Sequence, residues 1–127
     1  MHHHTTCAQC HTGATPNHEE RACATVINKV DCSICHAEPM RLFNESTHGV
    51  LLARGDQDAP DCTDCHGTHG TRGRTDPVSP TYVSNIAGLC AECHGEGGAA
   101  DVRHDESQIH HMVENYAESV HGRAVQN

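Results

Sequence analysis

The sequence predicts a mostly irregular chain with a few short α-helices and little or no β-sheet, folded around bound groups rather than around a hydrophobic core. Only 35% of the 127 residues are apolar, Trp is absent, and the only aromatic residues are Phe43, Tyr82 and Tyr116. Burial returns about 25 cal/mol per Å² of apolar surface, whereas ordering the backbone costs roughly 1–2 kcal/mol per residue. Chains with so little to bury are usually disordered or built around disulfides, metals or large cofactors.

Cysteine and histidine are the residues that favour bound cofactors over disorder, with nine and fourteen copies respectively. The length predicts a single domain over residues 1–127, as a mature or truncated part of a longer chain. The formal net charge of −9 argues against a nucleic-acid partner, which would need a basic face. No apolar run approaches the roughly 20 residues of a membrane-spanning helix, so we expect no transmembrane segment. No signal peptide is recognisable in the sequence.

The helices are expected to be short. Apolar spacing predicts them over residues 18–30, 37–47 and 106–121, with Gly49 ending the second. The last has one apolar stripe, with His110 and His121 three turns apart along its flank. Segments 56–60 and 70–80 are rich in Gly, Pro, Asp and Thr and are predicted to be loops. No strand pattern persists over five residues.

Eight of the nine cysteines form four C-x-x-C pairs, and a histidine directly follows each pair. Zinc sites, thioredoxin-like redox centres and covalent c-type haem all use C-x-x-C. Zinc places no demand on the residue after the second cysteine, and a thioredoxin site occurs once, at a strand-to-helix turn. The cysteines are Cys7 and Cys10, Cys32 and Cys35, Cys62 and Cys65, and Cys90 and Cys93.

Covalent haem explains the histidine that follows each pair. Cysteines three residues apart lie on one side of a helical turn, so both sulfurs reach the vinyl groups and the next imidazole reaches the iron. Four such histidines arising by chance has a probability on the order of one in ten thousand. The sequence therefore predicts four haem C groups, with thioether bonds from the eight cysteines and one axial ligand each from His11, His36, His66 and His94. A chain of this length has a radius of gyration of roughly 14 Å, so the haems would be close neighbours.

A repeated segment, E-S-x-H-G, supplies candidates for the second axial ligand. It occurs at residues 45–49 and 118–122, preceded in both copies by an aromatic residue two positions earlier. We interpret His48 and His121 as distal ligands, with the following glycine allowing the backbone to approach a porphyrin closely.

His69, three residues after His66, would serve a neighbouring haem because it does not easily turn to the same iron. The fourth distal ligand remains open. His18 is our choice, and the alternatives are the pair His110 and His111, the N-terminal histidines at positions 2–4, or a histidine of a neighbouring molecule. Met40 and Met112 are alternative ligands that would raise the haem potential. They are better explained as gap-filling apolar side chains.

Cys23 lies outside the four motifs. We interpret it as a buried free thiol that behaves as a small apolar residue, with an intermolecular disulfide as the alternative.

The sequence resembles the multihaem c-type cytochromes of the doubled C-x-x-C-H kind. The four motifs, the run from Cys65 to His69, residues 79–86 and the two E-S-x-H-G segments carry this resemblance. It implies a periplasmic or extracellular electron carrier with bis-histidine haems and redox protein partners. Some tetrahaem relatives form extracellular filaments in which a histidine of one subunit ligates a haem of the next.

The predicted function is electron hopping through four closely packed bis-histidine haems towards an extracellular acceptor, without substrate chemistry. All-histidine ligation implies low potentials and no open iron site. The alternative is an enzyme, a small multihaem reductase of the nitrite or hydroxylamine type, which needs one iron with an open position.

Overall fold

The structure is a computed structural model in which residues 5–11, 29–102 and 111–126 are described. Short helices alternate with irregular segments, and no strand occurs within these ranges, in agreement with the predicted fold class. None of the described helices is long and apolar enough to cross a membrane.

The described helices are listed here in chain order. They are α1 (Cys7–Cys10), a 3₁₀ turn η1 (Cys32–Ile34), α2 (Ala37–Glu45), α3 (Thr47–Ala53), α4 (Cys62–His66), α5 (Ile86–His94), α6 (Ala99–Val102), α7 (Met112–Glu118) and α8 (Val120–Gln126).

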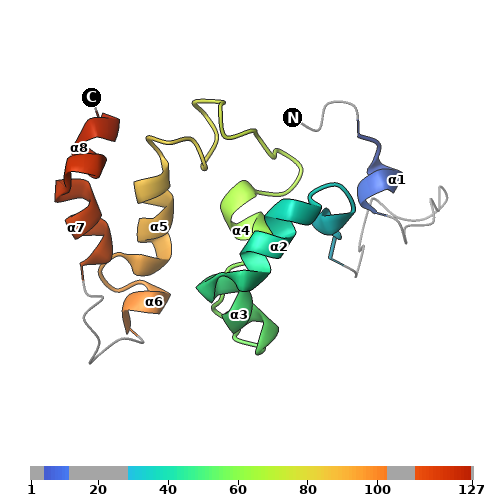
Figure 1. Cartoon of the computed structure of the whole chain (residues 1–127), viewed down its shortest axis with the longest axis horizontal. Coiled ribbons are helices and arrows are strands. Elements are labelled where there is room, and N and C mark those ends of the chain that lie inside the picture. The colour runs from blue at the N-terminus through green and yellow to red at the C-terminus, as the bar shows by residue number, and fades with distance from the viewer. Residues whose placement is uncertain (1–4, 12–28, 103–110, 127) are drawn as a thin grey trace, which may run out of the picture.

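The helices form two neighbouring groups that follow the order of the chain. Helices α5 to α8 lie together at one end of the molecule, with α7 packed against α5, while α2 to α4 lie in the middle and α1 lies beyond them (Figure 1). A long irregular segment joins α4 to α5 and connects the two groups. As a result, the first motif lies on α1, the second and third lie in the middle group, and the fourth lies in the end group.

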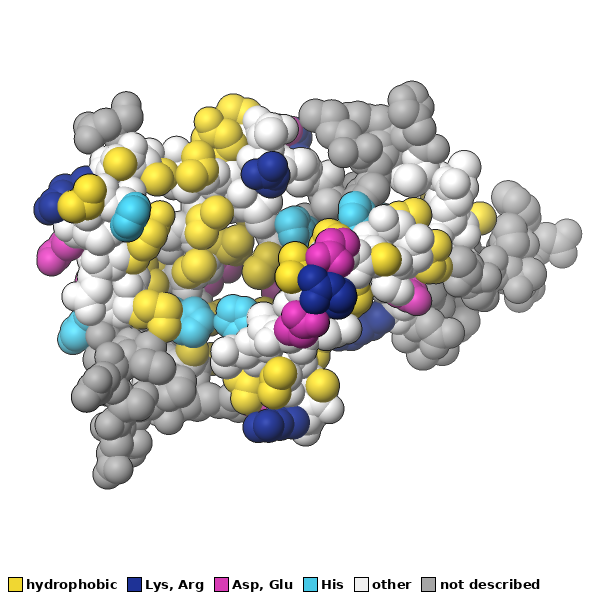
Figure 2. All heavy atoms as spheres, viewed as in Figure 1, with side chains coloured by type: hydrophobic (Ala, Val, Ile, Leu, Met, Phe, Trp, Pro, Cys, Tyr) yellow, Lys and Arg dark blue, Asp and Glu magenta, His cyan; other side chains and the backbone are white. Residues whose placement is uncertain are grey.

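No described apolar side chain is fully buried, and the only fully buried side chain in these ranges is that of Ser79, at 1% exposure. Val78, Val102 and Val120 are 70%, 71% and 74% exposed. Figure 2 shows apolar side chains spread over the face of both groups, with histidines among them. The polypeptide described here has no hydrophobic core of its own, as its composition predicted.

Both E-S-x-H-G segments fold into the same unit, in which two helices are joined by one serine. Ser46 is extended (ψ 162°), donates a hydrogen bond to the carbonyl of Phe43 (2.6 Å) and accepts one from the amide of Gly49 (3.2 Å). In the second copy Ser119 (ψ 163°) makes the equivalent bonds, at 2.6 and 3.0 Å. Serine thereby ends the first helix and caps the second. The histidine is the second residue of the second helix in both copies.

The glycine of this unit is required by the protein backbone. Gly49 and Gly122 are buried, and a Cβ on either would overlap the carbonyl oxygen of the aromatic residue six positions earlier. The glycines thus allow two consecutive helices to pack closely, and an approach to a porphyrin stays a prediction. The prediction that Gly49 ends a helix was wrong, because α3 continues to Ala53.

The predicted helix over residues 106–121 is interrupted at Ser119, where the chain is extended between α7 and α8. His110 lies outside the described residues, so its expected three-turn relation to His121 stays a prediction. The predicted helix over residues 18–30 lies almost entirely outside the described ranges. The prediction over 37–47 is confirmed as α2, which ends at Glu45, and segments 56–60 and 70–80 are non-helical as predicted.

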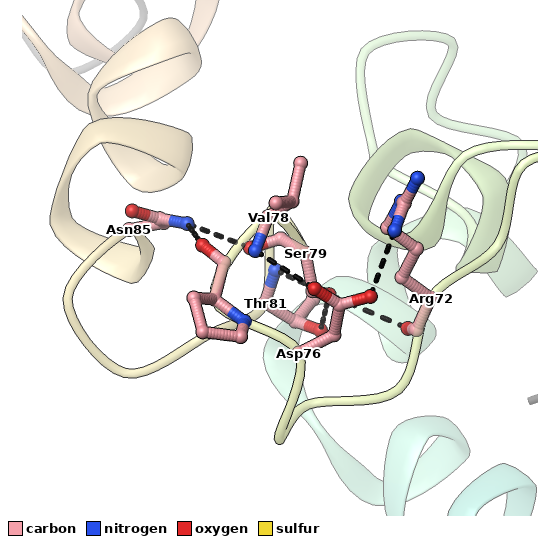
Figure 3. Close-up of polar contacts among 7 residues, drawn as sticks. Arg72, Asp76, Val78, Ser79, Thr81 and Asn85 are labelled. Atoms are coloured by element: carbon pink, nitrogen blue, oxygen red, sulfur yellow. Dashed lines mark hydrogen bonds and ion pairs between the residues drawn. The ribbon is translucent and has the colours of Figure 1, made fainter.

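The segment between α4 and α5 is ordered by polar contacts rather than by helix formation (Figure 3). Asp76 accepts bonds from the Val78 amide (3.0 Å) and Arg72 (2.8 Å), and both lower the pKa of its carboxyl group. The amide side chain of Asn85 donates to the carbonyls of Ser79 (2.8 Å) and Pro77 (3.0 Å). These bonds fix the start of α5, and with it the position of the fourth motif.

Substitution Gly49→Ala is expected to reduce the free energy of unfolding by about 1–3 kcal/mol, because the new methyl group overpacks the backbone at Phe43. Gly88→Ala is the matched control, since Gly88 lies within α5 and a Cβ there would meet nothing within 4 Å. We expect the control to be neutral or stabilising by up to about 1 kcal/mol. Chemical denaturation of the haem-loaded protein measures both; equal effects of the two substitutions would contradict the backbone explanation.

Candidate functional site

Each C-x-x-C pair lies in a helical turn, as the haem interpretation requires. The first three pairs open α1, η1 and α4, and the fourth lies at the C-terminal end of α5. Asp31 and Asp61 start two of these turns by accepting hydrogen bonds from backbone amides of Ser33 (2.9 Å) and Thr63 (2.8 Å). All eight motif cysteines are free thiols and so remain available for thioether bonds.

The motif histidines continue the helical turns that carry the cysteines. The amides of His11 and His36 donate to the carbonyls of Cys7 (2.8 Å) and Cys32 (2.9 Å). His66 and His94 are the last residues of α4 and α5. Each imidazole is therefore presented directly after its cysteine pair by local backbone structure alone.

Two of the motif histidines face two of the predicted distal histidines. The ring centroids of His48 and His94 are 5.9 Å apart, with an angle of 35° between the ring planes. Those of His11 and His69 are 6.0 Å apart, at 41°. Both contacts join residues that are distant in the sequence. His48, in α3, meets the histidine of the fourth motif, and His69, in the segment after α4, meets the histidine of the first motif.

This spacing fits two imidazoles that bind one metal atom from opposite sides. Metal–imidazole nitrogen distances of about 2.0–2.1 Å place the centroids of two such rings roughly 6.3 Å apart. The observed separations of 5.9 and 6.0 Å are close to this value. The separations of the two ring pairs therefore fit a metal atom bound between two histidines. Nδ1 of His11 is buried and has no hydrogen-bond partner.

The zinc interpretation requires a different arrangement. A structural zinc site gathers four Cys or His donors around one point. Within the described ranges, no group of three or more His, Cys, Asp or Glu side chains is placed to hold a metal ion. The histidines instead form two pairs, His48 with His94 and His11 with His69.

Two of the other predicted ligands, His66 and His121, are not brought together with a histidine in this way. His121 is exposed, and no other histidine ring lies against it or against His66 in the described part of the chain. His111 is the N-cap of α7, in the left-handed conformation (φ 67°). His18, His110, Cys23 and the histidines at positions 2–4 lie outside the described residues.

The third motif lies close to the second and to the fourth. Burial is the main cause that raises the pKa of the Cys62 thiol, and the neighbouring Cys32 thiol acts in the same direction. Burial is also the main cause that raises the pKa of the Cys65 thiol, with Cys90 and Cys93 acting in the same direction through their charge. Cysteines of the second and fourth motifs thus lie within electrostatic reach of the third motif.

An ion pair between segments far apart in the sequence supports this arrangement. The ammonium of Lys29 lies 2.6 Å from Oδ2 of Asp61, and the Asp61 side chain is only 18% exposed. This bond and that of Thr63 hold the pKa of Asp61 at about 2, below its usual 3.8. Asp61 therefore joins the residues before the second motif to the start of the third.

Comparison with known proteins identifies one similarity. The family described as the doubled CXXCH motif matches residues 48–99, a segment that begins at His48 and contains the third and fourth motifs and His69. No curated protein and no solved structure matches the chain. The family match supports a multihaem c-type cytochrome, and the C-x-x-C-H motifs indicate covalently bound c-type haem.

The Asp61 carboxylate is expected to make stability depend on pH. Because its pKa in the folded chain, about 2, lies below the usual 3.8, the ionised group stabilises the fold above pH 4. This contribution declines as the pH falls from 4 through 2. We expect the difference in free energy of unfolding between the native chain and Asp61→Asn to be constant above pH 4 and to shrink below it. Denaturation curves between pH 6 and pH 2 measure this; a difference that grew with acidity would contradict the assignment.

Proposed function

We propose that the chain carries four covalently attached haem C groups and transfers electrons among them without chemistry on a substrate. The observation that carries this proposal is the pairing of His48 with His94 and of His11 with His69 at the spacing expected for a shared iron. When bound, haem iron supplies reversible one-electron oxidation and reduction. The polypeptide supplies attachment, axial ligands and exclusion of water.

The roles of the protein side chains follow from their positions. The cysteine pairs would attach the porphyrins to helical turns, and the histidine that follows each pair would bind the iron. His48 and His69 would supply second iron ligands, because their rings lie against motif histidines. An iron held between two imidazoles has no open coordination position, which suits an electron carrier and favours a low potential.

The cellular location and the partner proteins that we propose are supported by the chemistry of haem attachment and by the charge of the chain. Covalent haem attachment takes place outside the cytoplasm, so we propose a periplasmic or extracellular location and an extracellular electron acceptor. The formal charge of −9, to which haem propionates would add negative charge, favours docking to basic redox partner proteins.

A filament subunit is a further proposal for the assembled form. His121 is presented by the same helix–serine–helix unit as His48, is exposed, and faces no histidine ring in the described part of the chain. We propose that His121 ligates a haem of a second copy of this chain. The histidines at positions 2–4 would likewise ligate a haem of another copy of this chain.

We expect the protein to carry four haems whose irons have no open coordination position. The intact protein should weigh more than its residues by four haem groups, and its spectrum should be low-spin. In His48→Ala we expect one of the four irons to become high-spin and to bind carbon monoxide after reduction.

Thr47→Ala, which changes the neighbouring residue of α3, is the control and should stay low-spin. A colourless protein would contradict the proposed function. A high-spin iron in the unmodified protein would favour the reductase alternative.

Filament formation is tested by electron microscopy and sedimentation of the haem-loaded chain. We expect elongated particles from the native chain, and their loss in His121→Ala or after replacement of the histidines at positions 2–4. The control His69→Ala should keep the particles, because His69 faces a histidine of its own chain. A monomer at micromolar concentration would contradict the filament proposal and leave electron transfer unaffected.

A further inference from the structure

We propose that Ser46 is a positioning residue for the fourth redox site, because its hydroxyl fixes α3 against α2 and so holds the His48 imidazole against His94. This inference rests on the proposed function, in which His48 and His94 bind one iron. It gives a role in ligation to a hydroxyl group that lies two residues before the ligand. This role differs from that of a helix cap, which would stabilise α3 without fixing its direction.

The position of the His48 ring depends on the direction of α3. His48 is the second residue of this helix, which has only 7 residues, Thr47–Ala53. A helix this short is marginal by itself and takes its direction from contacts with the rest of the chain. The His48 ring lies against that of His94, whose helix α5 belongs to the other group of helices (Figure 1). The joint between α3 and the preceding helix α2 therefore decides whether the two rings meet.

One oxygen atom joins α2 to α3. The hydroxyl of Ser46 donates a hydrogen bond to the carbonyl of Phe43 (2.6 Å) and accepts one from the amide of Gly49 (3.2 Å). Phe43 lies in the last turn of α2, whereas Gly49 lies in the first turn of α3. Ser46 is half-buried, which reduces the competition of water for both bonds. The hydroxyl therefore ties the end of one helix directly to the start of the next.

The carbonyl of Phe43 is the fixed point of this joint. It accepts a hydrogen bond from the amide of Ser46 (2.9 Å) as well as from the hydroxyl. Gly49 is buried against the same carbonyl, where a Cβ would overlap it. The backbone of Ser46 (φ −77°, ψ 162°) lies in the broad extended region, where neighbouring values are allowed as well. The bonds to Phe43 therefore select one angle between the helices from this range.

The second helix–serine–helix unit repeats this joint around Ser119. Its hydroxyl donates to the carbonyl of Tyr116 (2.6 Å) and accepts from the amide of Gly122 (3.0 Å). The two units lie in different groups of helices, yet both place a histidine two residues after the serine. The agreement between two separate copies indicates that the hydroxyl belongs to the presentation of the histidine.

Donation to Phe43 distinguishes a joint from a helix cap. Aspartate caps helices as well as serine does, because its carboxylate accepts from the backbone amide. An ionised carboxylate has no hydrogen to donate, so it cannot make the bond to the Phe43 carbonyl. Threonine has a hydroxyl and can make both bonds. Ser46→Ala therefore removes both bonds, Ser46→Asp removes only the bond to α2, and Ser46→Thr removes neither.

The experiment measures the binding of carbon monoxide to the haem-loaded protein after reduction with dithionite. Carbon monoxide binds an iron with two axial histidines only after it displaces one of them, so its apparent affinity reports how firmly His48 is held. In Ser46→Ala and Ser46→Asp we expect the concentration that half-saturates one iron to fall roughly tenfold, because one or two hydrogen bonds are lost. Ser46→Thr should stay within about twofold of the unmodified protein, since both bonds remain.

Two controls alter Thr47, the exposed residue between Ser46 and His48. Thr47→Ala removes a hydroxyl and Thr47→Asp adds a carboxylate, and each leaves the bonds of Ser46 in place. Both should bind carbon monoxide as the unmodified protein does. When Ser46→Ala is combined with His48→Ala, we expect no effect beyond that of His48→Ala, because the ligand that Ser46 positions is gone.

Unchanged binding of carbon monoxide in Ser46→Ala overturns the inference. Native-like binding in Ser46→Asp also overturns it, because a helix cap would then suffice to hold the ligand. If Ser46→Ala fails to load haem, the comparison of Ser46→Asp with Ser46→Thr decides. A chain without haem, or a His48→Ala variant that opens no iron, contradicts the proposed function, whereas four haems with His48 held equally well in every Ser46 variant contradict only the role of Ser46.

Discussion

The contact between imidazole rings from distant parts of the chain is the interaction on which the arrangement depends. Each of the two contacts, His48 with His94 and His11 with His69, joins segments that share no hydrophobic core. A metal atom bound between such rings would hold these segments together more strongly than the few apolar contacts of the polypeptide. In this respect the proposed iron centres combine a structural role with a redox role, as metal sites do in other small domains.

The polypeptide contributes rigid local units that present these ligands. Three of the four cysteine pairs begin a helical turn, two of them capped by aspartate, and the helix–serine–helix unit presents His48 and His121 in the same way. Such units are stable through backbone hydrogen bonds and caps and need little apolar surface. Many apolar side chains remain exposed in the polypeptide alone and would be available to cover bound groups.

The closeness of the motifs links this architecture to electron transfer. The ion pair of Lys29 with Asp61 holds the second and third motifs together, and the two histidine contacts bring His11 and His94 against other segments of the chain. Groups bound at these motifs would therefore be neighbours as well. Closely spaced one-electron centres with filled coordination exchange electrons readily and offer a substrate no open position, which favours a carrier over an enzyme.

The sequence by itself determined the chemistry of the site. Four C-x-x-C-H motifs indicate c-type haem because local helical geometry places two sulfurs and one imidazole together, and the lean composition predicted the missing core. The repeated E-S-x-H-G segment predicted His48 as a ligand but not the reason for its glycine. That reason, the close approach to the Phe43 carbonyl, and the break at Ser119 became visible only from backbone packing. Only the tertiary structure decided that His48 meets His94 and that His69 meets His11, since a contact between distant segments depends on the path of the whole chain.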